Sequence, residues 1–156
     1  MKSKFFLGLM GLVFLVTMGL GSALAADMKQ VGPALAVSPA VAALDSKTDI
    51  VIMGSGFTPG QEVMILMEDS FGLLTGLDVM AVANERGCFA EVWSMDRYAS
   101  RGIIKAGVHS LRAADKDYNV LTSAPLALVD VTEDPKKWPE YGKAAGLKPK
   151  KKKKKK

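Results

Sequence analysis

The chain has very little cysteine and histidine. Among its 156 residues, Cys88 is the only cysteine and His109 the only histidine. A lone cysteine excludes an intrachain disulfide, so the fold must be stabilised by packing. A blue-copper site needs two histidines and a cysteine, which this chain cannot supply. A Ser-His-Asp catalyst would have to use His109, and no serine lies in a nucleophile-elbow context. We expect His109 to be a strand residue and Cys88 a small buried one.

Nucleotide-binding chemistry is also missing. The segment from Gly54 to Gly60, GSGFTPG, has glycines in the outline of a dinucleotide-binding fingerprint. Its third glycine comes one place too late, and Pro59-Gly60 leads into an expected strand, whereas that fingerprint needs a helix N-terminus. We therefore expect no cofactor, no small-molecule substrate and no enzymatic activity.

A long apolar run occurs only at the start of the chain. Lys2 and Lys4 precede the uncharged apolar run Phe5 to Leu20, and Ala23-Leu24-Ala25 has the small-x-small pattern of a signal-peptidase site before Ala26. The run is shorter than the roughly 20 residues that span a bilayer, although a retained anchor is the alternative. No cysteine follows it, which argues against a lipoprotein. We predict a signal peptide at 1–25, a flexible lead at 26–33, and export to the periplasm or the extracellular space.

Charge is distributed unevenly. Residues 26–147 hold 11 basic and 16 acidic side chains, a net charge of −5. The segment 148–156, here called the lysine segment, carries +8 on Lys148, Lys150, Lys151, Lys152, Lys153, Lys154, Lys155 and Lys156. Such a run repels itself and buries nothing, so disorder is expected. It would attract anionic lipids or polymers, and nucleic acid without sequence recognition; a solubilising role with no partner is the alternative.

The rest of the chain has the pattern of an all-β protein. Ala34 to Leu44 is apolar but interrupted by Pro39, which is typical of an edge strand. Strands are also expected over Ile50 to Phe57 and Glu62 to Glu68, followed by a loop over Phe71 to Gly76 with an exposed tip.

Two hairpins are expected next. The first joins 77–83 to 88–95 through Asn84-Glu85-Arg86-Gly87, and the second joins 108–114 to 120–131 through a polar connection at 115–119. About seven short strands at this spacing indicate a β-sandwich. We place the sandwich at 34–131, an extension at 132–147 and the lysine segment at 148–156.

Several landmarks of this region occur together and in order. They are Gly54-Ser55-Gly56-Phe57-x-Pro59-Gly60-x-x-Val63, Ala83-Asn84-x-x-Gly87-x-Phe89, Ala106-Gly107-x-His109-x-Leu111-x-Ala113 and Ser123-Ala124-Pro125-Leu126. With these landmarks the chain resembles the bacterial Ig-like β-sandwich domains of exported and cell-envelope proteins. The resemblance implies a single immunoglobulin-like sandwich with no shared catalytic residues. Glu91 departs from the family pattern. It shares a strand face with Phe89 and Trp93, where the family usually has a small or apolar residue.

Two further groups of residues are candidate sites. Asp115, Asp117 and Asn119 alternate as at the start of a calcium loop, but Val120 and Leu126 stand where an EF-hand needs glycine and glutamate. A weak calcium site and a solvated hairpin tip both remain open. The second group is aromatic: Tyr98, Trp138 and Tyr141 are candidates for partner contact, and Trp138 and Tyr141 could alternatively fold back onto a sheet edge.

These observations predict an exported, non-catalytic binding module of the envelope or extracellular space. Its expected partner is an anionic envelope polymer or lipid surface, contacted by the lysine segment, or another envelope protein. One alternative is a structural subunit that assembles by β-strand addition through Ala34 to Leu44 or an open sheet edge. Another is an accessory subunit of an envelope enzyme complex.

Overall fold

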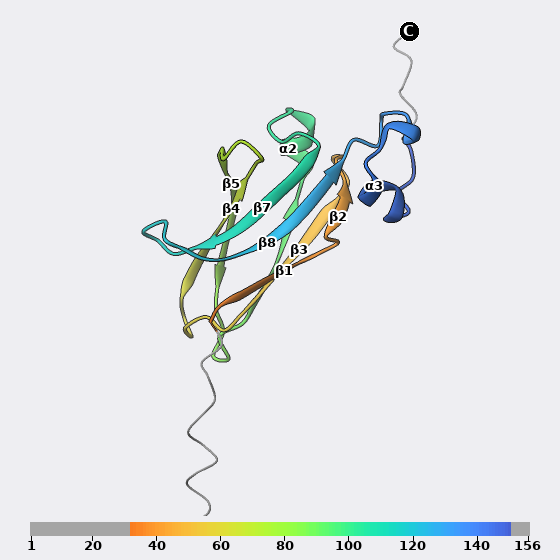
Figure 1. Cartoon of the computed structure of the whole chain (residues 1–156). Helices are drawn as coiled ribbons and strands as arrows, with labels where there is room; N and C mark the ends of the chain where they lie inside the picture. Colours follow the sequence, from red (N-terminus) through yellow and green to blue (C-terminus); the bar gives the residue numbers. More distant parts are fainter. Residues whose placement is uncertain (1–31, 151–156) are drawn as a thin grey trace, which may run out of the picture. The chain divides into compact units, whose positions relative to one another are not determined.

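The computed structural model describes residues 32–150 as strands in two sheets with short helical segments (Figure 1). The predicted signal peptide, residues 26–31 of the predicted lead, and Lys151 to Lys156 lie outside the described residues. In chain order the elements are β1 (Ala34–Ser38), β2 (Val41–Ala43), β3 (Asp49–Ser55), β4 (Glu62–Glu68), β5 (Leu74–Val82), β6 (Phe89–Ser94), α2 (Asp96–Ser100), β7 (Gly107–Ala114), β8 (Val120–Val129), the 3-10 turn η1 (Pro135–Lys137) and α3 (Glu140–Ala144).

The strands form a small and a large sheet. The small sheet has the order β1-β3-β6 and the large sheet the order β2-β8-β7-β4-β5. All pairs are antiparallel except β2 with β8, which is parallel. The prediction of an all-β chain with two sheets is therefore confirmed.

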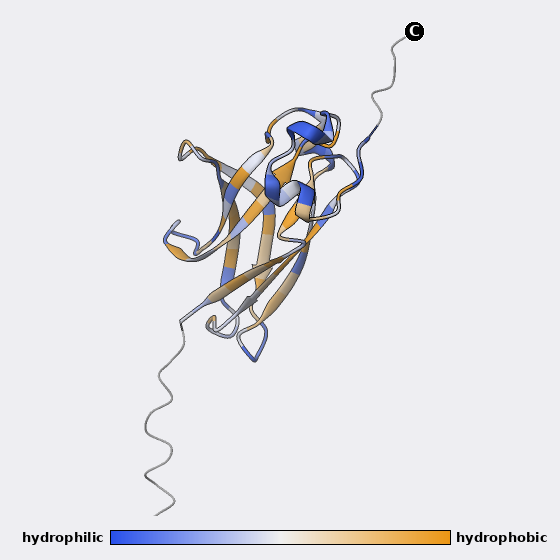
Figure 2. Cartoon of the chain, turned by 45° about the vertical axis from the view of Figure 1, so that its right-hand side comes forward, coloured by the Kyte–Doolittle hydropathy of each residue, from blue (hydrophilic) through white to orange (hydrophobic). Residues whose placement is uncertain are grey.

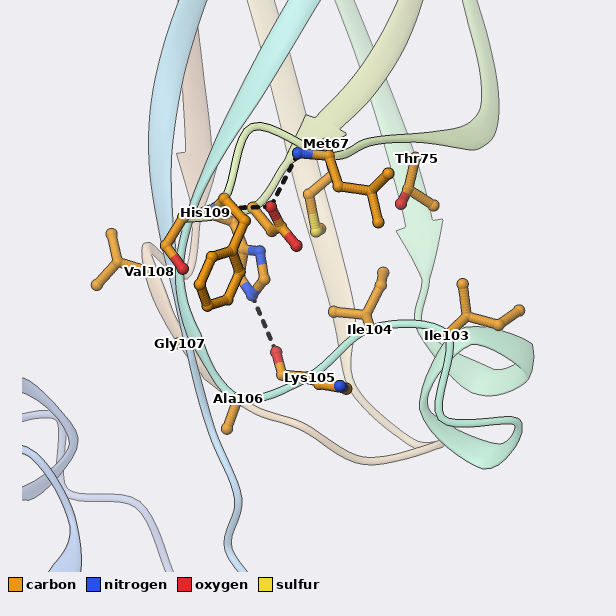
Figure 3. A pocket seen from close by; sticks show the side chains of 13 residues that line it. Met67, Thr75, Ile103, Ile104, Lys105, Ala106, Gly107, Val108 and His109 are labelled. Atoms are coloured by element: carbon orange, nitrogen blue, oxygen red, sulfur yellow. Dashed lines mark hydrogen bonds between the residues drawn. The ribbon is translucent and has the colours of Figure 1, made fainter.

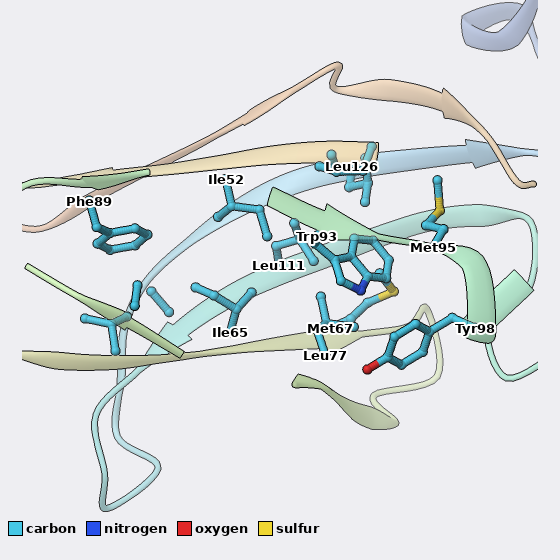
Figure 4. Packing of buried hydrophobic residues seen from close by; sticks show 14 of the residues in the cluster. Ile52, Ile65, Met67, Leu77, Phe89, Trp93, Met95, Tyr98, Leu111 and Leu126 are labelled. Atoms are coloured by element: carbon cyan, nitrogen blue, oxygen red, sulfur yellow. The ribbon is translucent and has the colours of Figure 1, made fainter. Parts of the chain in front are cut away.

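The core lies between the two sheets (Figure 4). Ile52 and Trp93 of the small sheet are buried against Ile65, Leu111 and Leu126 of the large sheet. Along β4 the residues alternate between fully buried and partly buried positions, as the period of two in a strand requires. Figure 2 shows the hydropathy of the residues along the strands, with hydrophobic residues in both sheets.

The N-terminal edge strand is split. We predicted one strand over Ala34 to Leu44, but β1 ends at Ser38 and β2 begins at Val41. β1 is an edge of the small sheet and β2 an edge of the large one, with Pro39 between them. Proline has no N–H to donate to a ladder, so the chain leaves one sheet there and joins the other. This break gives eight strands instead of about seven.

The first predicted hairpin is wrong. β5 belongs to the large sheet and β6 to the small one, so the connection at 83–88 crosses between the sheets. Both strands point alternate side chains into the same core, and that pattern does not distinguish neighbours in one sheet from strands on opposite sheets. Gly87 does have the positive φ expected of it, at 71°. The second predicted hairpin, β7 with β8, is confirmed.

The predicted loop at Phe71 to Gly76 is shorter than expected, because β5 already begins at Leu74. β5 continues the pairing with β4 as far as Leu74 opposite Glu68, across a bulge next to Ile65. The β4–β5 connection is therefore residues 69–73, and it carries the apolar side chains that remain outside the sheet.

Candidate functional site: an apolar loop end

Two connections far apart in the sequence meet at one end of the sandwich. β4 ends at Glu68, which lies opposite Ser110 near the start of β7. Residues 69–73, which follow β4, and residues 101–107, which precede and begin β7, therefore lie side by side. Together they line a hollow of about 210 Å³ (Figure 3). We call residues 69–73 and 101–107 the loop end.

Large apolar side chains point out of the loop end instead of into the core. The exposed fraction is 94% for Phe71, 66% for Leu73 and 48% for Ile103, and all three line the hollow. Val108, at the start of β7, is also exposed. Single exposed apolar residues are ordinary, but these four line the same hollow, so the loop end is a candidate interaction site.

The carboxylate of Asp69 fixes the first connection. Its Oδ1 accepts hydrogen bonds from the backbone N–H of Phe71 at 2.8 Å and of Leu73 at 2.9 Å. The backbone N–H of Asp69 donates to the carbonyl of Leu73 at 3.0 Å, and that of Gly72 donates to the carbonyl of Asp69 at 3.1 Å. The backbone hydrogen bond from Leu73, and to a smaller extent the one from Phe71, lowers the pKa of Asp69. The connection is thus a closed turn with its apolar side chains directed outward.

His109 fixes the second connection. It is a buried residue of β7, as expected of a strand histidine, and its Nε2 lies 2.9 Å from the carbonyl oxygen of Lys105 (Figure 3). A carbonyl only accepts, so Nε2 carries the proton. Nδ1 is buried and has no hydrogen-bond partner among residues 32–150. The histidine therefore ties the backbone of Lys105 to the strand that follows it.

The chemistry of the loop end suits apolar contact. Its hollow is smaller than the roughly 300 to 1,000 Å³ of pockets that enclose small ligands. Within the described part of the chain, no group of three or more His, Cys, Asp or Glu side chains is placed to hold a metal ion.

The C-terminal extension packs against the sheet beside the loop end. Trp138 is buried against Val129 and Val131, and Tyr141 and Leu147 pack against the same cluster. A Cβ on Gly142 would lie 2.9 Å from Val129 Cγ2, so α3 sits close against β8. Of the two alternatives for Trp138 and Tyr141, the structure shows folding back onto a sheet edge. The burial of Trp138 leaves it little surface for a partner.

This extension fixes where the lysine segment begins. The backbone N–H of Lys150 donates to the carbonyl of Val131 at 2.7 Å, and Lys150 Nζ lies 3.6 Å from Asp45 Oδ2. Val131 follows β8, whose Leu128 lies opposite Gly107 of the loop end. Lys148 and Lys150 are exposed. The lysine segment therefore starts at the same end of the sandwich as the apolar loops.

Tyr98 has a structural position. It is buried on α2, and its ring packs edge-to-face on Trp93, with the ring centroids 5.5 Å apart (Figure 4). Its hydroxyl lies 3.2 Å from both the carbonyl of Gly76 and Asp78 Oδ2, and Asp78 pairs with Arg97. These contacts join α2 to the bulged edge strand β5. The partner role predicted for Tyr98 therefore lacks the exposed aromatic surface it needs.

The calcium candidate forms a self-contained hairpin turn. Asp115 Oδ1 accepts from the backbone N–H of Asp117 and of Asn119, and Oδ2 accepts from Asn119 Nδ2, all at 2.9 Å. The Asn119 side chain is the main cause of the lowered pKa of Asp115. The structure thus brings Asp115 and Asn119 together, with both carboxylate oxygens engaged. The expectation of a small buried residue at Cys88 is wrong, because this free cysteine is only partly buried.

The sequence pointed to part of this site. The spacing of the apolar residues in Phe71 to Gly76, Leu73 among them, predicted an exposed loop tip, and the loop at 96–106 was a second place to look for a site on the sandwich. Asp69, Ile103 and Lys105 were not singled out as residues. An aspartate two residues before Phe71-Gly72 is a recognisable turn signal, because its carboxylate caps nearby backbone N–H groups. The contribution of Ile103 depends on the pairing of β4 with β7, which no local pattern shows.

Comparisons with known proteins add little. No protein family matches the chain, and no curated protein matches it significantly. Among solved structures, it is similar to a tetra-tandem repeat in the extending region of a large adhesion protein, at 20% identity and a TM-score of 0.37. That alignment covers 62% of this chain and 24% of the other, so the chain spans about a quarter of the length of that structure.

Within the described residues, no helix is both long and apolar enough to cross a membrane.

Proposed function

We propose that this chain is an exported, non-catalytic binding module of the cell envelope or extracellular space, held at an anionic surface by its lysine segment. The observation that carries the proposal is the anchored extension. Trp138 packs on β8 and Lys150 bonds to Val131, so the cationic residues start from a defined position. Each lysine near an anionic membrane contributes about 1 kcal/mol of attraction, and this attraction weakens as salt screens it.

We further propose that the sandwich is immunoglobulin-like. If β1 and β2 are counted as one interrupted strand, seven strands remain. The first, second and fifth of these form the small sheet, and the third, fourth, sixth and seventh lie in the large sheet. An immunoglobulin constant domain places its fourth strand with the first, second and fifth instead, so the proposed likeness is to the wider group of such sandwiches.

Co-sedimentation with isolated envelope material tests the tether. The matched variant replaces Lys151 to Lys156 with serine, which keeps the chain length and leaves Lys150 bonded to Val131. We expect the natural chain to sediment with the envelope at low salt and to be released steeply as salt rises, and the serine variant to lose this salt-sensitive fraction. Equal sedimentation of both chains across the salt series would show that the lysines do not tether the protein.

The second candidate is a structural subunit. β6 is an edge of the small sheet, and its Val92 is exposed, so an added strand could pair there. Ala34 to Leu44 is less available as a donor, because β1 and β2 already pair with β3 and β8. A structural subunit should form concentration-dependent oligomers that persist at high salt. Light scattering that shows a monomer across a wide concentration range would exclude this candidate.

A further inference from the structure

We infer that the anionic surface is a lipid bilayer and that the loop end inserts into it, with Phe71, Leu73 and Ile103 reaching the acyl chains. This inference rests on the proposed function, because the lysine segment supplies the electrostatic part of the attachment. The loop end supplies the apolar part.

The apolar side chains have surface to bury. Phe71 is almost fully exposed and Leu73 is two-thirds exposed, so the fold itself gains little from either. Transfer of one such side chain from water to hydrocarbon strengthens binding roughly tenfold or more. A charged polymer would instead be recognised by cations and hydrogen-bond donors. Exposed phenylalanine and leucine therefore favour a lipid over a polyanion as the occupant.

The backbone of the tip is already suited to a bilayer interface. A polar backbone group that enters an apolar medium without a hydrogen bond is strongly disfavoured. The N–H groups of Phe71, Gly72 and Leu73 all donate within the turn, two of them to the Asp69 carboxylate and one to the Asp69 carbonyl. The tip can therefore leave water without losing hydrogen bonds from these groups.

The loop end is also held in one conformation before it binds. Asp69 closes the 69–73 turn, and His109 holds the backbone of Lys105 beside it. A surface that is fixed in its bound form loses less conformational entropy on binding. Three apolar side chains held outward on two tied connections can therefore insert together.

The local charge of the loop end does not attract a membrane by itself. Arg101 and Lys105 are exposed cations there, but Asp69 and Asp96 lie at the same end and balance them. The attraction must come from the lysine segment. One weak membrane signal gives only marginal attachment, and stable anchoring takes two. The combination of an apolar tip and a polybasic segment meets this requirement.

The two signals lie close enough to reach one surface. β8 is two strand spacings from β4 in the large sheet, about 10 Å, and it leads to Val131, where Lys150 is bonded. Lys148 and Lys150 are exposed at this position. Cations can therefore contact headgroups around an inserted loop end.

Vesicle flotation tests the inference. The protein is recovered after export and its N-terminus is read by mass spectrometry, because an uncleaved residue 5–20 run would itself bind lipid. Phosphatidylglycerol vesicles are compared with phosphatidylcholine vesicles and with dextran sulfate as a soluble polyanion. The loop variant is Phe71→Ser with Leu73→Ser. The matched control is Met80→Ser with Val82→Ser, which removes two comparably exposed apolar side chains, 63% and 59%, from β5.

We expect the natural chain to prefer phosphatidylglycerol vesicles and to keep part of its binding at high salt. The loop variant should lose at least tenfold in affinity together with the salt-resistant part, and the control should stay within twofold of the natural chain. A Phe71→Trp variant should shift its fluorescence to shorter wavelength on these vesicles and be quenched by brominated acyl chains. All variants should keep the far-UV spectrum of the natural chain, because the changed side chains are exposed.

The outcomes separate this inference from the proposed function. A loop variant that binds vesicles as well as the natural chain overturns insertion, even if the Lys151 to Lys156 serine variant shows that the tether is real. Binding to dextran sulfate as tight as to vesicles, with no effect of the loop variant, assigns the site to a polymer and also overturns it. Vesicle binding that needs Phe71 and Leu73 but not the lysines would support insertion and contradict the tether.

Discussion

The two ends of the sandwich treat phenylalanine in opposite ways. At the end formed by residues 56–61 and 83–88, Phe57 is 4% exposed and packs on Phe89, with ring centroids 5.2 Å apart. At the loop end, Phe71 is 94% exposed. Both residues lie in short connections between strands. The difference shows that the first end closes the core, whereas the second presents apolar surface outward.

The hydrogen bonds of the two ends differ in the same sense. We call the end formed by residues 56–61 and 83–88 the closed end. Its two connections are joined by backbone hydrogen bonds: the N–H of Phe57 donates to the carbonyl of Gly87 at 3.1 Å, and the N–H of Gly60 donates to the carbonyl of Ala83 at 2.8 Å. At the loop end, Asp69 satisfies its own turn through its side chain. The two connections of the closed end are thus held by each other, whereas the 69–73 connection of the loop end is held by its own aspartate.

Truncation of the two phenylalanines should give the largest contrast. We expect Phe57→Ala to lower the free energy of unfolding by about 3 to 5 kcal/mol, because it opens a cavity beside Phe89. We expect Phe71→Ala to change it by less than about 0.5 kcal/mol, because its side chain contacts mainly solvent. Urea unfolding of both variants measures the difference. A similar loss for both would mean that the loop end is part of the core.

Glycine substitutions probe how tightly the closed end is built. A Cβ on Gly87 would overlap the backbone carbonyl oxygen of Phe57, and its φ of 71° disfavours any other residue. Gly60 has a similar φ, 76°, but open space around it. We expect Gly60→Ala to cost about 1 to 2 kcal/mol from backbone strain alone and Gly87→Ala to cost at least about 3 kcal/mol. Equal midpoints in urea would contradict the close approach.

The sequence was informative about strands and less so about their partners. Alternation and turn residues identified β4 and the β7–β8 hairpin, because those signals are local. The same signals placed β5 and β6 in one hairpin, although the chain crosses between sheets at residues 83–88. Both arrangements bury alternate residues, so periodicity cannot separate them. Pro39 indicated an edge but not the change of sheet that occurs there.

The same limit applies to the candidate site. Phe71 was predicted to lie in a loop with an exposed tip, because Phe71 to Gly76 carries spaced apolar side chains. Ile103 was not singled out, because it meets Phe71 only through the pairing of β4 with β7, more than 30 residues away in the chain. The anchoring of Lys150 at Val131 likewise depends on a tertiary contact.

Substitutions of Asp69 test whether the hydrogen bonds of its carboxylate keep the 69–73 turn ordered, and whether that order matters for binding. Asp69→Ala removes the acceptor of two backbone hydrogen bonds, whereas Asp69→Asn keeps an acceptor oxygen and loses only the charge. We expect the alanine variant to show faster amide exchange at Phe71 and Leu73 and a severalfold loss of vesicle affinity, and the asparagine variant to retain most of both. If both variants bind vesicles like the natural chain, order in the turn does not matter for binding.

Acid should lower the stability of the turns closed by Asp69 and Asp115 and of the contact between Asp45 and the extension. Of the effects predicted here, we expect this one to be the smallest. The pKa of Asp69 is lowered by the backbone hydrogen bonds of Leu73 and Phe71, and that of Asp115 by the side chain and backbone of Asn119. At Asp45, burial raises the pKa, but hydrogen bonds from Lys47 and Thr48 and the charge of Lys150 outweigh it.

In all three cases the folded pKa lies below the unfolded one, so the deprotonated carboxylate favours the folded state. The stability from these groups is fully present above the unfolded pKa and is lost as pH falls through the folded pKa, below about pH 4. Urea unfolding from pH 6 to pH 2 should show this decline, and a triple variant with asparagine at positions 45, 69 and 115 should flatten it. High salt screens general charge repulsion but not these hydrogen bonds. A profile that salt flattens completely would therefore assign the decline to net charge and not to these carboxylates.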